Sequence, residues 1–180
     1  MNTDLAMQYY LKAVDNFPYN LEFTIENLNY ALSYDPCHVQ SMTLMGVIEM
    51  YIMKDYPKAK RIFYDAIASN KSFPDTYKML ATLHIWLGEF EYAERVIDFA
   101  MKQSACNFET MYRIQAMKYE YKGQLKKAKK ALQKAQFYAF QNDQLNVIKM
   151  DLTRVNSKLK KVKKERKRRM KKKNFEEIKM

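Results

Sequence analysis

Three segments of the chain place their apolar residues with helical spacing. The segments are 56–72, 90–105 and 125–140, and each runs from a large apolar residue to an alanine, a second large residue and a second alanine, at intervals of three, four and three. These intervals put all four residues on one face of an α-helix. Each segment therefore predicts a helix whose alanines let a neighbouring helix approach closely. The quartets are Tyr56/Ala59/Phe63/Ala66, Phe90/Ala93/Ile97/Ala100 and Leu125/Ala128/Leu132/Ala135.

A second predicted helix precedes each quartet and has a small residue of its own. These small residues are Gly46, Ala81 and Ala116. Gly88 and Gly123 fall where the first helix of a pair must end, which is where glycine is favoured. The first alanines of successive quartets are 34 and 35 residues apart. The chain therefore repeats a helix–turn–helix unit.

This arrangement resembles the tetratricopeptide repeat (TPR) family, whose pattern is W-x2-L-G-x2-Y followed by A-x3-F, A and P. The pattern appears as Tyr77-x2-Leu80-Ala81-x2-His84 with Ala93-x3-Ile97 and Ala100, as Tyr112-x2-Gln115-Ala116-x2-Tyr119 with Ala128-x3-Leu132 and Ala135, and as Met42-x2-Met45-Gly46-x2-Glu49 with Ala59-x3-Phe63 and Ala66. The last of these copies has one extra residue between its helices, and a first unit at about 4–38 keeps only Leu28, Ala31 and Pro36. The resemblance covers about 4–140 and implies an all-α, helix–turn–helix repeat solenoid of about four helix pairs.

The pattern changes after Phe140. An apolar stripe then follows helical spacing through Leu145, Ile148, Leu152, Val155, Leu159 and Val162. We expect a TPR-like domain at 1–142, a capping helix at 143–157 that covers the exposed end of the array, and a basic tail at 158–180 that is a frayed helix or disordered. A coiled-coil dimer is the alternative interpretation of the stripe.

The charge of the chain is concentrated in this tail. The formal net charge is +12, and residues 158–173 contain twelve Lys/Arg and one acid, so the rest of the chain is nearly neutral. Only 3 glycines and 4 prolines occur, which argues against a β-rich fold. Two unpaired cysteines, no signal peptide and no long apolar run predict a cytoplasmic protein without a membrane span, or a nuclear one if the organism has a nucleus.

Catalytic and metal-binding patterns are missing from the sequence. The two histidines, His38 and His84, lie in different repeats, and His84 occupies a helix-packing position. No Cys/His set has metal-ligand spacing, and no phosphate-binding loop or nucleophile elbow occurs. We therefore expect no enzyme activity, no metal and no cofactor.

The TPR resemblance implies a concave groove, lined by the first helix of each repeat, that binds a peptide or helix of a partner protein. The predicted lining residues are Thr43, Val47, Met50, Tyr51, Lys78, Thr82, Ile85, Trp86, Arg113, Met117, Glu120 and Tyr121. Methionine and aromatic residues are enriched at partner-binding surfaces. Packing of some of these residues against the C-terminal helix is the alternative. A carboxylate clamp for chaperone tails would need asparagine where Thr82 and Met117 stand, so we do not expect that ligand.

The tail predicts an acidic partner. Its cationic residues are Lys160, Lys161, Lys163, Lys164, Arg166, Lys167, Arg168, Arg169, Lys171, Lys172 and Lys173. Nucleic acid bound through phosphate contacts, without sequence reading, is the alternative function that this charge supports. A short repeat array could also associate with a second copy of itself, so a homo-oligomer is a further expectation.

Overall fold

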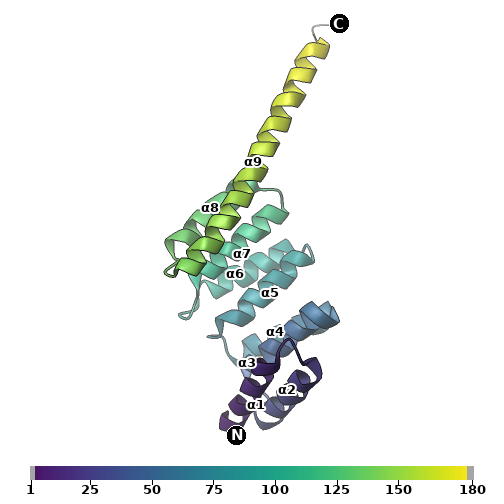
Figure 1. The fold of residues 1–180 in the computed structure, drawn as a ribbon, viewed down its shortest axis with the longest axis vertical. Helices are drawn as coiled ribbons and strands as arrows, with labels where there is room; N and C mark the ends of the chain where they lie inside the picture. Colours follow the sequence, from purple (N-terminus) through teal and green to yellow (C-terminus); the bar gives the residue numbers. More distant parts are fainter. Residues whose placement is uncertain (1–2, 178–180) are drawn as a thin grey trace. The chain divides into compact units, whose positions relative to one another are not determined.

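The computed structural model describes residues 3–177, with side chains described from 4 to 170. Within this range the chain is helical throughout apart from short connections, and successive helices form antiparallel pairs (Figure 1). The predicted all-α repeat architecture is confirmed. The helices are α1 (Thr3–Asn16), α2 (Leu21–Tyr34), α3 (Val39–Ile48), the π-helix η1 (Glu49–Met53), α4 (Tyr56–Ser69), α5 (Pro74–Trp86), α6 (Phe90–Ala100), α7 (Phe108–Tyr121), α8 (Leu125–Phe137) and α9 (Asn142–Glu177).

The chain divides into two compact units, which we describe separately. Unit 1 is Met1–Asn107 and contains α1 to α6, and unit 2 is Phe108–Met180 and contains α7 to α9. Polar side chains cap the first turns of α2 and α4 in unit 1. The side chain of Asn20 accepts a hydrogen bond from the backbone of Phe23, and Asp55 accepts one from Lys58, so each satisfies a free N–H at the beginning of a helix.

The centre of unit 1 is built on the repeat positions. Met50, Ala59, Phe63, Leu80 and Leu83 are fully buried and pack in one cluster that joins α4 to α5. The small residue of α3, Gly46, lies directly against the ring of Phe63. A methyl group added at Gly46 would lie 2.5 Å from Cε1 of Phe63, so only glycine leaves room for the ring there.

The extra residue of the second repeat is absorbed by the π-helix. The backbone N–H of Lys54, at the end of η1, bonds to the carbonyl of Glu49 five residues earlier, so the last turn is wider than that of an α-helix. Lys54 then takes a left-handed conformation with φ of 60°. Gly88 and Gly123 take the same conformation at the corresponding turns, with φ of 74° and 69°. The residue at the turn therefore has a left-handed backbone in all three repeats, although in one of them it is a lysine and not the glycine that suits this conformation.

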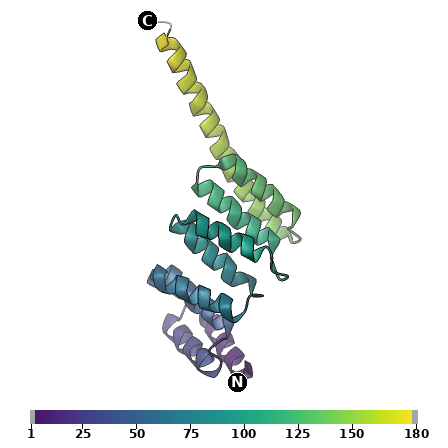
Figure 2. The ribbon, with the colours of Figure 1, turned by 180° about the vertical axis from the view of Figure 1, so that it is seen from behind.

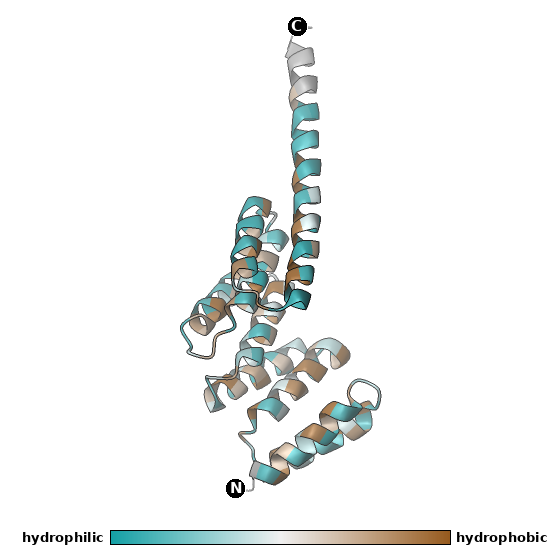
Figure 3. Cartoon of the chain, turned by 60° about the vertical axis from the view of Figure 1, so that its left-hand side comes forward, coloured by the Kyte–Doolittle hydropathy of each residue, from teal (hydrophilic) through white to brown (hydrophobic). Residues whose placement is uncertain are grey.

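Unit 2 contains one helix pair and the long helix α9. Ala116, Ala128, Leu132 and Val155 form its buried cluster, so the first half of α9 packs on the pair. Leu159 is the last residue of α9 in this cluster, and the helix runs on beyond it (Figure 2). All side chains from 160 to 170 are exposed, and Figure 3 shows that this part of α9 is mostly hydrophilic. None of the helices described is both long enough and apolar enough to cross a bilayer.

Candidate partner-binding groove

An aromatic pair dominates the predicted groove face of unit 1. Tyr51 extends from η1 and Trp86 ends α5, and their rings meet edge to face with centroids 5.1 Å apart and planes at 78°. The two side chains are 39% and 38% exposed, so each keeps a free side while supporting the other. Burial of the remaining surface raises the pKa of the Tyr51 hydroxyl. The pair is a rigid, half-exposed aromatic surface, which is the kind of surface that dominates binding energy at protein interfaces.

One buried hydrogen bond joins α3 to α5. The hydroxyl oxygens of Thr43 and Thr76 lie 2.7 Å apart in a buried hydrogen bond between the two helices. Thr82 donates a hydrogen bond to the carbonyl of Lys78, one turn earlier, and both side chains are half-buried. Val47 is half-buried and packs on the core cluster of unit 1. Thr43 is therefore structural, whereas Val47, Lys78 and Thr82 keep part of their surface open to solvent.

Two predicted groove residues have no surface to offer a partner. Met50 and Ile85 are both 0% exposed. Each lies four residues after the small residue of its helix, at Gly46 and Ala81. Met50 packs with Leu80 and Leu83 of α5, so the next helix pair covers its side chain. In this structure neither Met50 nor Ile85 presents side-chain surface to solvent.

In unit 2, α9 contacts two of the predicted groove residues. Glu120 of α7 accepts hydrogen bonds from Arg154 at 2.9 Å and from Lys158 at 2.7 Å. These bonds, with that of Arg154 the largest effect, hold the pKa of Glu120 below its usual value. Arg113 lies 3.6 Å from the carboxylate of Asp151, also on α9. Arg113 and Glu120 therefore both contact the C-terminal helix.

The other two predicted groove residues of α7 differ in exposure. Met117 is half-buried, and Tyr121 is exposed at the end of the helix. Tyr121 is thus the one residue of the predicted α7 set that presents a large ring to solvent.

Comparison of the structure with solved proteins finds similar folds, among them MamA and PilW. MamA from Desulfovibrio magneticus RS-1 has a TM-score of 0.60 at 17% identity, covering 89% of this chain and 94% of that chain. PilW, described as a widely conserved type IV pilus biogenesis factor, has a TM-score of 0.64 at 16% identity, covering 88% of this chain and 78% of that chain. The chain has a tetratricopeptide-repeat fold. No protein-family model and no curated protein matches the sequence.

The TPR fold explains why the position four residues after the small residue is covered. In a stacked array this side of the first helix meets the next helix pair. Glu120 stands at that position in α7, and it is α9 that covers it, through Arg154 and Lys158. The first half of α9 thus contacts α7 and α8 as the first helix of a further repeat would.

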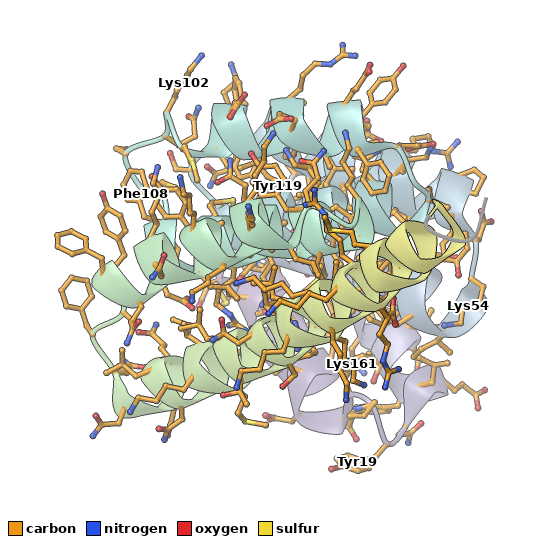
Figure 4. The ribbon with its side chains drawn as sticks, turned by 90° about the horizontal axis from the view of Figure 1, so that it is seen from above. Tyr19, Lys54, Lys102, Phe108, Tyr119 and Lys161 are labelled. Carbon is orange, nitrogen blue, oxygen red and sulfur yellow. The ribbon has the colours of Figure 1, made fainter. Side chains whose placement is uncertain are left out.

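The tail residues lie on a helix instead of in a coil. Lys160, Lys161, Lys163, Lys164, Arg166, Lys167, Arg168 and Arg169 are all exposed. Lys161 points away from the ribbon in Figure 4. The side chains of Lys171, Lys172 and Lys173 lie outside the described residues. No helix packs against 160–170 within the described part of unit 2, so the charge there surrounds the helix on all sides.

Sequence reasoning missed a polar network around His84 in unit 1. The ring nitrogens of His84 contact the carboxylate of Glu89 at 2.6 Å and the hydroxyl of Tyr64 at 3.0 Å, and Lys60 pairs with the same carboxylate at 2.9 Å. Burial is the main cause of the lowered pKa of His84. Tyr64 and Lys60 belong to α4, His84 to α5 and Glu89 to the following turn, so the network joins these three segments. The His84 ring also stacks on Tyr92 of α6. Among the described residues no group of His, Cys, Asp or Glu is placed to hold a metal ion.

Proposed function

We propose that this protein is a non-enzymatic scaffold that binds a peptide or amphipathic helix of a partner protein on the first-helix face of unit 1. The observation that carries the proposal is the pair Tyr51–Trp86, which combines a fixed geometry with free ring surface. Exposed aromatic side chains that are held by neighbours lose little conformational freedom on binding. They therefore give more binding free energy per unit of buried surface than mobile side chains do.

The surroundings of the pair favour an apolar ligand. Ile52 directly follows Tyr51 and is 40% exposed, and Leu87 directly follows Trp86 and is 36% exposed. Lys78 is the cation of the predicted set in this unit. An amphipathic helix with one or two large apolar anchors and an acidic residue beside them fits this chemistry.

The fluorescence of the protein offers a direct test, because Trp86 is the sole tryptophan of the chain. Helical peptides selected from a displayed library against the full chain should shift the Trp86 emission to shorter wavelength and protect it from acrylamide. Tyr51→Ala should weaken their binding at least about tenfold, as removal of a central aromatic residue costs about 2 kcal/mol at many interfaces.

The matched control is Tyr19→Ala, since Tyr19 is an exposed tyrosine in the α1–α2 turn of the same unit (Figure 4). That variant should bind the peptides as the wild type does. Peptides that bind Tyr51→Ala and wild type equally, or that leave the Trp86 emission unchanged, would refute the assignment of this face.

A second candidate function rests on the exposed cations of α9. We propose as the alternative that residues 160–173 bind nucleic acid through phosphate contacts. A chain ending at Leu159 should retain the packed half of α9 together with the Lys158–Glu120 pair. This shortened chain should lose any RNA or DNA affinity seen at low salt. For the full chain, log Kd should rise by about one unit per tenfold increase in salt concentration for each phosphate contacted. Equal affinities of the two chains would exclude the tail as the site.

A further inference from the structure

Two phenylalanine side chains of unit 2 are exposed to solvent at the turn between α8 and α9. Phe137 ends α8 and Phe140 precedes α9, and their side chains are 80% and 91% exposed. Among the large apolar side chains that the structure describes, only Tyr19 is more exposed than Phe140. Exposure of single apolar residues is common, but two full rings within four residues form a protruding apolar surface.

The backbone of this turn is held by hydrogen bonds to one side chain. The side-chain oxygen of Gln144 accepts hydrogen bonds from the backbone of Phe140 at 3.1 Å and of Gln141 at 3.2 Å. Between the two phenylalanines, Tyr138 turns inward and stacks on Phe108, with centroids 5.2 Å apart. Phe108 lies beside other aromatic rings at one edge of the protein in Figure 4. The ring of Phe137 meets Tyr138 edge to face with centroids 5.2 Å apart, and Gln144 holds the backbone of Phe140.

Cations share the outward face of α8 with Phe137. The helix contains five lysines and no acidic residue. Its alanines face the core, and the residues at intervals of four, seven and eleven from Lys126 lie on the opposite side. These positions include Lys130 and Phe137, so a line of positive charge leads to the exposed ring.

We propose that the α8–α9 turn and the outward face of α8 form a docking surface for an anionic lipid bilayer. Phenylalanine rings favour the boundary between head groups and acyl chains, and lysines beside them attract anionic head groups. The surface carries both features on one rigid element. Its residues are not those of the aromatic pair of unit 1 or of the cationic tail, so this inference does not depend on either proposed function.

The apolar side chains favour a lipid surface over a single-stranded nucleic acid. Nucleic-acid bases stack on flat rings, but the exposed apolar residues here continue into α9 as Val147 and Met150, and Met150 is 70% exposed. Aliphatic side chains offer no stacking face, whereas they enter the acyl boundary readily. A phenylalanine ring also has no polar edge with which to read a base.

Flotation of the full-length protein with vesicles tests the proposal. The vesicles contain phosphatidylcholine with or without an equal share of phosphatidylglycerol, at about 0.3 M salt, which weakens binding that rests on charge alone, such as that of the tail, more than binding that also inserts apolar rings. Wild type should bind the mixed vesicles and not the neutral ones. Phe140→Ser should lower binding about tenfold, and Tyr19→Ser, which removes an equally exposed ring from unit 1, should leave it unchanged.

The charge of α8 has its own pair of variants. Lys126→Gln/Lys130→Gln should lower binding several-fold, while Lys54→Gln/Lys71→Gln, which removes two exposed lysines of unit 1, should not. Circular dichroism and Trp86 emission check that each variant is folded. An insertion reporter, Phe140→Trp in a Trp86→Phe background, should shift its emission to shorter wavelength and be quenched by lipids brominated on the acyl chain.

Three outcomes would overturn the proposal. The first is equal vesicle binding by wild type and Phe137→Ser/Phe140→Ser. The second is a Phe140→Trp emission that vesicles do not change. The third is a loss of single-stranded RNA affinity in the phenylalanine variants without any loss of vesicle binding, which would assign the same turn to nucleic acid.

Discussion

The contact between Gly46 and Phe63 allows a sharp test of how the repeats pack. Gly46→Ala places a methyl group 2.5, 2.8 and 3.0 Å from three carbons of the Phe63 ring, all closer than normal van der Waals contact. The ring is fully buried in the cluster with Ala59 and Leu80, so it has little room to move. Forcing a methyl group into a packed core costs about 1–3 kcal/mol.

Helix propensity acts in the opposite direction. Alanine in a helix interior is more favourable than glycine by about 1 kcal/mol. Because the ring faces the methyl group with three atoms, we take the upper half of the packing cost, about 2–3 kcal/mol. The net expectation is that Gly46→Ala lowers the free energy of unfolding by about 1–2 kcal/mol, measured by urea unfolding followed by circular dichroism.

The other repeats supply the compensating variant. Ala81 and Ala116 hold the small position there, and the residue that corresponds to Phe63 is aliphatic in both, at Ile97 and Leu132. We therefore expect Phe63→Ile to remove the penalty of Gly46→Ala, with a coupling energy of at least about 1 kcal/mol in the double-mutant cycle. If Gly46→Ala alone stabilises the protein by about 1 kcal/mol, as propensity predicts, the steric reasoning is wrong.

Three further predictions concern the turn, the C-terminal helix and the buried histidine. Lys54→Gly should raise the free energy of unfolding by about 0.5 kcal/mol, because glycine adopts positive φ without strain; thermal unfolding measures it, and no gain would contradict the strain. Glu120→Gln should weaken the docking of α9 by about 1 kcal/mol, seen as faster hydrogen exchange from α9. Since its pKa is lowered, the contribution of Glu120 is complete above the ordinary value of 4.5 and is lost as pH falls through the folded value. His84 also has a lowered pKa, so stability should fall as pH decreases below 6.5, and His84→Gln should remove that slope.

The repeat register could be predicted from the sequence because it is set by local spacing. Ala59, Ala93 and Ala128 are fully buried, as their positions on the helix faces predict. Helical spacing fixes which face of each helix is apolar. The small alanine side chains on that face let the neighbouring helix pack closely. The extra residue of the second repeat was also visible in the sequence, but spacing alone does not say that a π-helix absorbs it.

The groove was less predictable, because one helix face touches two kinds of neighbour. Met50 lies in η1, on the side that borders both the open groove and the next pair, and only the packed structure shows that it is covered. The exposure of Phe140 could not be predicted either, since the apolar pattern gives no reason for a ring to face solvent in a fixed turn. Both depend on contacts between segments that the sequence pattern does not relate.

The long helix α9 also sets the reach of its charge. The eighteen residues from 160 to 177 extend about 27 Å beyond the packed segment at 1.5 Å per residue. A straight helix that is anchored at one end confines its cations to a narrow volume, whereas a flexible tail would spread them through a cloud. Since the charge lies on all sides of the helix, a polyanion can lie along it at any angle of rotation. The anchored helix therefore restricts where, relative to unit 2, a polyanion can meet the charge. It does not restrict which side of the helix the polyanion contacts.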